Sequence, residues 1–137
     1  MSAFTRAELE FIRSQRLGRL ATVNEDGDPQ IAPVGFRYNA ELDTIDIGGY
    51  NLSNSKKFRN IQRNGRVAFV LDDVVPPWQP RGVEIRGRAE AITDGSKAGS
   101  GDIDAALIRI HPTRIIGWGI DTHPYKRNSR RIGSDRT

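Results

Sequence analysis

Short runs in which apolar and polar residues alternate, separated by polar turns, recur along most of the chain. In a strand, successive side chains point to opposite faces, so this alternation predicts strands that are buried on one face. The turn at residues 24–29 contains Gly27, which can adopt the positive φ that a tight hairpin requires. Short strands at regular spacing predict an antiparallel barrel, with six strands expected at residues 17–23, 30–38, 44–49, 67–72, 81–92 and 107–119.

Prolines interrupt this pattern at two points. Three of the five residues from 76 to 80 are proline, which predicts a loop at residues 74–80 because proline lacks the donor that a central strand needs. Trp78 in this loop suits packing or contact with a second chain. For the same reason we expect the last strand to break at His111–Pro112.

Two short helices are expected. Thr5 and Glu8, three residues apart, form the signature of a capping box, which predicts a helix that ends near Arg16. The second helix lies in residues 50–66, where Ser53 or Asn54 can cap it and Phe58 and Ile61 would face the core.

The second helical stretch is strongly basic. Residues 50–66 carry no acidic side chain and five basic ones, Lys56, Lys57, Arg59, Arg63 and Arg66. A capped helix start offers free backbone N–H groups and a partial positive charge, which together attract anions. With hydroxyls and two lysines at that end, phosphate is the expected ligand. The alternative is a solvated basic helix without a ligand.

Composition points to a small protein that needs a second chain. Only 36% of the 137 residues are hydrophobic, so we expect a homodimer to complete the core. The sequence contains no run of eighteen apolar residues and no basic-then-apolar leader, so we expect neither a membrane-spanning segment nor a signal peptide. The absence of cysteine is compatible with a cytoplasmic protein.

The net charge is concentrated at one end. Residues 125–137 hold five basic side chains and one acidic one, so their net charge of +4 equals that of the whole chain. We therefore expect a charge-balanced domain at residues 1–124 and a basic tail at 125–137. A disordered solubilising end is the simplest expectation for the tail. The balanced domain has no cluster of exposed aromatic residues on its predicted strands, which argues against a nucleic-acid partner.

No constellation of catalytic side chains is visible in the sequence. His111 and His123, the only histidines, lie twelve residues apart without a carboxylate at ligand spacing, so no metal site is expected. The sequence also lacks a nucleophile elbow, a phosphate-binding P-loop and a dinucleotide fingerprint. The catalytic residues are therefore unknown, and the chemistry would have to come from a bound cofactor.

Several ordered motifs resemble a known family. Residues 55–67 contain Ser-x-Lys and then Ile-x-x-Asn-Gly-Arg-Val between two predicted strands. Residues 17–22 are followed by Gly27-x-Pro29 and Pro33-Val34, and residues 84–89 read Glu-x-x-Gly-x-Ala. Over residues 4–120 the chain resembles the flavin-binding split-barrel family typified by pyridoxamine 5′-phosphate oxidase. Gly65 stands where that family usually has proline.

The resemblance implies a mainly β protein, a six-stranded antiparallel split β-barrel with a few short helices. It also implies a homodimer with the cofactor between the subunits. The cofactor phosphate would be held near Tyr50, Asn51, Ser55, Lys56 and Lys57, and the ring would lie along Ile31, Ala32, Pro33, Val34, Gly35 and Phe36. Trp118 would lie close to the cofactor pocket or the dimer contact, or it could simply plug the end of the barrel.

The cofactor implied by the resemblance is coenzyme F420, an 8-hydroxy-5-deazaflavin, with FMN as the alternative. Residues 110–119 resemble the closing strand of the actinobacterial, deazaflavin-using branch, and the Arg-x-His-Asp-Arg type motif of the pyridoxamine phosphate oxidases is missing. An oxidoreductase that transfers hydride to a small unsaturated organic substrate is therefore expected, although a non-catalytic carrier of the cofactor would have the same sequence features. The basic tail could attract the oligoglutamate arm of F420. The substrate itself is not identified by the sequence.

Overall fold

The computed structural model describes residues 1–94 and 105–133. These residues form one antiparallel sheet of eight strands with two α-helices and a short 3-10 helix. The strand order is β2-β1-β5-β6-β7-β4-β3, and β8 pairs with β7. The strands are β1 Leu17–Val23, β2 Pro29–Gly35, β3 Arg37–Asn39, β4 Thr44–Ile47, β5 Arg66–Val75, β6 Gln79–Ile92, β7 Leu107–Trp118 and β8 Arg127–Arg131. The helices are α1 Arg6–Ser14, η1 Leu52–Asn54 and α2 Lys56–Arg63.

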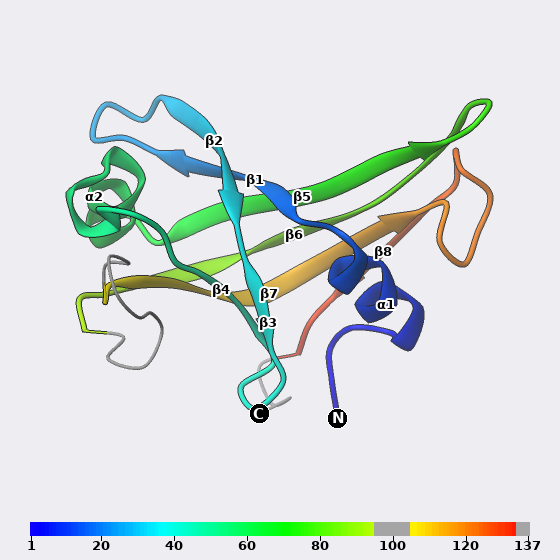
Figure 1. Cartoon of the computed structure of the whole chain (residues 1–137), viewed down its shortest axis with the longest axis horizontal. Coiled ribbons are helices and arrows are strands. Elements are labelled where there is room, and N and C mark those ends of the chain that lie inside the picture. Colours follow the sequence, from blue (N-terminus) through cyan, green and yellow to red (C-terminus); the bar gives the residue numbers. More distant parts are fainter. Residues whose placement is uncertain (95–104, 134–137) are drawn as a thin grey trace.

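The sheet curls into the half-open barrel that the alternating pattern predicts (Figure 1). Its long strands β5, β6 and β7 run side by side, while α1 and α2 lie toward different ends of the sheet. The mainly β, antiparallel split-barrel fold is therefore confirmed. It has two strands more than expected, because the second predicted strand is divided and a further strand forms near the C-terminus. The structure contains one chain, so the homodimer remains a prediction.

The division of the second predicted strand separates two pairings. β2 pairs with β1, whereas β3 pairs with β4 on the other side of the barrel. Phe36 lies between them and packs edge-on against Phe69, with ring centroids 5.5 Å apart. At Phe36 the chain passes from β2 at one end of the strand order to β3 at the other.

The prolines interrupt the sheet less than expected. The β5–β6 hairpin continues to the pairs Val74↔Pro80 and Val75↔Gln79, so the loop is shorter than residues 74–80. Trp78 lies in this hairpin turn with 65% of its surface exposed. The predicted break at His111–Pro112 is also wrong. β7 is continuous through Pro112, and the pairing of β6 with β7 instead shifts register between Arg86 and Gly87.

The capping box at the start of α1 forms as predicted. The Glu8 N–H donates to the Thr5 hydroxyl at 3.1 Å, and the Thr5 N–H donates to the Glu8 carboxylate at 2.9 Å. Phe11 and Ile12 on the helix are buried in the core. The same core holds the largest fully buried side chains of the sheet and of α2, among them Leu20, Ile45, Phe58, Phe69, Leu71, Ile85, Ile108 and Ile115. In the part of the chain that the structure describes, neither helix is long and apolar enough to cross a membrane.

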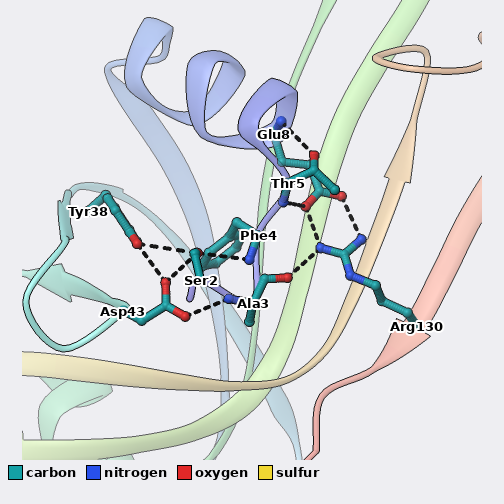
Figure 2. Close-up of polar contacts among 8 residues, drawn as sticks. All are labelled: Ser2, Ala3, Phe4, Thr5, Glu8, Tyr38, Asp43 and Arg130. Atoms are coloured by element: carbon teal, nitrogen blue, oxygen red, sulfur yellow. Dashed lines mark hydrogen bonds and ion pairs between the residues drawn. The ribbon is translucent and has the colours of Figure 1, made fainter. Parts of the chain in front are cut away.

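The basic C-terminal segment is ordered where it is described, so a disordered end is wrong for residues 127–131. These residues form β8, which pairs antiparallel with β7. Arg130 of β8 donates to both oxygens of the Glu8 carboxylate, at 2.9 and 2.5 Å, and to the Ala3 carbonyl at 2.6 Å. Figure 2 shows this contact beside a second one, in which the Asp43 carboxylate accepts from the Ser2 hydroxyl and the Ala3 N–H. The N-terminal segment is thus tied to two distant parts of the sheet.

Candidate functional site

A cavity of about 280 Å³ lies where β1 and β2 meet the start of α2. Its apolar wall comes from the two strands, and its charged wall comes from two consecutive lysines of the helix. The lining residues are Leu20, Thr22, Gln30, Ile31, Ala32, Lys56 and Lys57. None of these seven residues is acidic, so the cavity favours a ligand that combines an apolar surface with an anionic group.

The charged wall depends on where α2 begins. Ser55 is its N-cap, and its hydroxyl oxygen accepts from the Phe58 N–H at 3.3 Å while its hydroxyl hydrogen is donated to the Leu52 carbonyl at 2.6 Å. The expected caps, Ser53 and Asn54, are wrong because they belong to the 3-10 turn η1. Starting at Ser55 places Lys56 and Lys57 in the first helical turn, where N–H groups have no partner within the helix. Their ammonium groups add to the partial positive charge of that helix end.

Asn60 connects α2 to both strands of the apolar wall. Its fully buried side chain donates to the Thr22 hydroxyl at 3.0 Å and to the Gln30 amide oxygen at 2.8 Å. The Asn60 Oδ1 atom is buried without a hydrogen-bond partner in the structure. Buried acceptors usually have a partner, and a buried water molecule is the kind of donor that suits this atom.

Sequence reasoning missed Leu20, Thr22, Gln30 and Asn60. The one signal available was a polar Asn60 within the helical turn of Phe58 and Ile61, a position where an amide must find partners inside the fold.

The candidate residues of β2 divide between cavity and core. Ile31, with 69% of its surface exposed, and Ala32 line the cavity. Val34 is buried in the core, and Phe36 packs against Phe69. Pro33 and Gly35 are exposed outside the cavity lining. The structure therefore brings two of the six candidates from residues 31–36 together with the lysines.

Tyr50 and Asn51 lie in the segment that leads into η1. Tyr50 is 83% exposed, and Asn51 has a left-handed backbone with φ of 54°. The Asn51 amide oxygen accepts from Asn54 at 2.7 Å. Neither residue lines the cavity, although both stand close in sequence to its charged wall.

Trp118 lies in a neighbouring cavity of about 330 Å³ rather than beside the lysines. The guanidinium carbon of Arg127 in β8 lies 5.0 Å from the centre of a Trp118 ring, a cation–π contact. Ile31 lines both cavities and is their shared wall. The remaining lining of the second cavity comes from Arg19, Ala21, Ala68, Phe69, Val70 and Glu84.

The perturbed acids and bases lie outside the lysine-lined cavity. Burial opposes ionisation of Asp46, but hydrogen bonds from Arg109, Asn39 and Thr44 outweigh it and hold the Asp46 pKa below its usual value. Burial and the neighbouring Asp43 raise the Tyr38 pKa. No group of three or more potential metal-ligating side chains occurs among residues 1–94 and 105–133.

Comparisons with known proteins identify the family and the fold. The family model for pyridoxamine 5′-phosphate oxidase matches residues 4–119. A 5a,11a-dehydrotetracycline/5a,11a-dehydrooxytetracycline reductase of Streptomyces rimosus is 44% identical over 120 residues, which cover 86% of this chain and 84% of that protein.

Solved structures share the fold at low sequence identity. A conserved hypothetical protein of Mycobacterium tuberculosis matches with a TM-score of 0.69 and 21% identity, covering 99% of this chain and 96% of that one. A FAD-binding protein of Mesorhizobium loti matches with a TM-score of 0.63 and 19% identity, covering 85% and 94% of the two chains. Since the family model spans most of the sequence and the reductase is similar over most of its length, the chain belongs to the pyridoxamine 5′-phosphate oxidase family of split-barrel proteins.

Proposed function

We propose that this protein is a reductase that binds a phosphate-bearing, flavin-type cofactor in the lysine-lined cavity. Coenzyme F420 is the favoured cofactor and FMN the alternative. The observation that carries the proposal is the meeting of Lys56 and Lys57, at a helix start, with Ile31 and Ala32 in one cavity. An anionic group and a flat apolar ring are the two parts of such a cofactor.

The residues present fit that group. Two lysines and the first turn of α2 offer positive charge and free N–H donors to a phosphate. Hydrogen bonds to a charged group contribute about 1.5–3 kcal/mol each, enough for these side chains to dominate recognition of the phosphate. Asn60, which does not itself line the cavity, donates to Thr22 and Gln30 and so holds two of the lining side chains in place.

The described residues contribute mainly binding and positioning. When bound, the cofactor would supply the hydride. Lys56 and Lys57 would hold its phosphate, and Ile31 would support one side of its ring. Among the residues that the structure describes, no ionisable side chain other than these lysines lines the cavity, so we assign no catalytic acid. Solvent is the proposed source of the proton that completes the reduction. Fixing two reactants in contact can by itself supply a large share of rate enhancement.

The proposed substrate class is a planar, conjugated organic compound. Support comes from the 44% identity to a reductase that acts on dehydrotetracyclines, and from the Trp118 cavity, which shares Ile31 with the cofactor cavity. The Arg127 guanidinium, which lies over the Trp118 ring in that cavity, would donate hydrogen bonds to the oxygen substituents of such a compound. Reduction of its C=C bond adds one hydride and one proton to adjacent carbons.

We also propose a homodimer that acts in the cytoplasm. The cavity volume of about 280 Å³ lies just below the roughly 300–1,000 Å³ usual for ligand pockets. Ile31 and Trp78 expose 69% and 65% of their surfaces. A second chain would cover these side chains and enclose the cofactor.

Titration of the purified protein with F420 and with FMN, followed by cofactor fluorescence, tests the proposal. We expect saturable binding, tighter for F420, and oxidation of the reduced cofactor when a planar enone is added. Binding without turnover of any conjugated substrate would favour a carrier in the same cavity. Failure to bind either cofactor would refute the proposed function.

A further inference from the structure

Arginines face one another across four strands on the outer side of the sheet. Arg66 of β5 pairs directly with Arg88 of β6. Arg86 of β6 pairs with Arg114 of β7, which in turn pairs with Arg131 of β8. Residues directly opposite in an antiparallel pair project from the same face, so these five guanidinium groups share one surface.

Four of these five arginines form no ion pair with a carboxylate in the part of the chain that the structure describes. Arg86 forms an ion pair with Glu84 at 2.8 Å. Within residues 1–94 and 105–133, no carboxylate pairs with Arg66, Arg88, Arg114 or Arg131, and the Arg114 guanidinium donates instead to the Ser129 hydroxyl at 2.9 Å. Like charges directly opposite one another destabilise a sheet. The paired arginines therefore repel one another in the folded chain, and a bound anion would reduce that repulsion.

The surface is hollowed beside three of these arginines. A cavity of about 410 Å³ is lined by Arg66, Val67, Arg86, Gly87, Arg88 and Thr113. It lies where the β6–β7 register shifts, between Arg86 and Gly87. A side chain at Gly87 would collide with the His111 backbone, so glycine allows the strands to approach at this bend. Three arginines thus border one concave site, and two of them, Arg66 and Arg88, have no carboxylate partner in the described chain.

We propose that this cavity, named here the arginine site, binds a small anion that carries two or more negative charges. Guanidinium groups recognise phosphate and carboxylate oxygens through paired N–H donors, and several around one hollow favour a multiply charged ligand over a single charge. The arginine site shares no lining residue with the Lys56–Lys57 cavity and does not depend on the proposed function. Two sources of such an anion are a phosphorylated metabolite and an acidic side arm such as an oligoglutamate chain.

Calorimetric titration of the full chain with inorganic pyrophosphate and, separately, with pentaglutamate tests the arginine site. A Lys56→Ala/Lys57→Ala background removes the other anion-attracting position. In that background we expect Arg66→Ala/Arg88→Ala to weaken binding about tenfold or more, as the loss of about 1.4 kcal/mol or more would. Arg6→Ala is the matched control, because the Arg6 side chain is 95% exposed on α1. It should leave the affinity unchanged.

The outcomes are distinguishable. Tighter binding of pyrophosphate identifies a phosphorylated ligand, and tighter binding of pentaglutamate identifies a carboxylate arm; both support the site. Thermal unfolding without anion should show the double arginine variant no less stable than its background, because the substitutions remove repulsion. If neither anion binds, or the arginine variant binds both as well as its background does, the proposal is wrong. Dissociation of a dimer by the arginine substitutions, without anion binding, would instead assign these arginines to a subunit contact and also overturn it.

Discussion

Arg130→Ala is expected to destabilise the fold far more than its surface location in β8 would indicate. The Arg130 side chain is 29% exposed, but its partner Glu8 is only 5% exposed and accepts from Arg130 at two oxygens. Removing one partner of a buried pair costs about 3–5 kcal/mol, because the other charge remains buried. The Thr5 N–H still donates to Glu8, and Arg130 is partly solvated, so we expect about 2–4 kcal/mol.

Urea unfolding followed by tryptophan fluorescence measures this loss, and hydrogen exchange of residues 127–131 reports whether β8 detaches. Arg6→Ala, which breaks the exposed Arg6–Glu10 pair, should change little. The double variant Glu8→Gln/Arg130→Met removes both charges while glutamine preserves the capping box, so it should be more stable than Arg130→Ala alone. Equal effects of Arg130→Ala and Arg6→Ala would refute this reasoning.

Three further predictions concern packing, pH and assembly. Gly18→Ala would bring a Cβ atom against the fully buried Phe69 ring, so the free energy of unfolding should fall by about 1–3 kcal/mol, measured by thermal unfolding. An unchanged unfolding midpoint would mean that the ring moves aside without cost. Because the folded-state pKa of Asp46 is lowered, its stabilising contribution is present above its unfolded pKa of about 3.9 and is lost as pH falls through the lower folded value. Urea unfolding across this acid range should therefore show a shallower loss of stability for Asp46→Asn than for the unmodified protein, and parallel curves would contradict the assignment. Light scattering at micromolar concentration should give the mass of a dimer, whose interface we expect to bury at least about 1,600 Å². A stable folded monomer at that concentration would contradict the dimer.

The features that the sequence predicted well depend on nearby residues. The Thr5–Glu8 capping box is specified within four residues, and the alternation of residues 83–92 is sufficient to define most of β6. The family resemblance predicted that one cofactor site would contain Lys56, Lys57, Ile31 and Ala32. These four residues line the same cavity.

The features that the sequence did not predict depend on contacts between residues far apart in the chain. Residues 127–131 read as a polar, basic tail, and their strand conformation is supported by pairing with β7 and by the contact of Arg130 with Glu8, 122 residues away. The N-cap of α2 is Ser55 rather than Ser53 or Asn54, because those two residues form part of the 3-10 turn that precedes the helix. The break between β2 and β3 falls at Phe36, whose contact with Phe69, 33 residues away, no local pattern reveals.

The most direct test of the cofactor site is fluorescence titration of F420 against Lys57→Ala. If Lys57 binds the phosphate, its loss should cost about 1.5–3 kcal/mol, which raises the dissociation constant by a factor of about 10 to 150. Arg6→Ala, a control on an exposed basic side chain of α1 outside the cavity, should bind as the unmodified protein does. A cofactor analogue without the phosphate should bind equally to Lys57→Ala and to the unmodified protein. Equal affinity of the unmodified protein and Lys57→Ala for intact F420 would contradict the phosphate site at the start of α2.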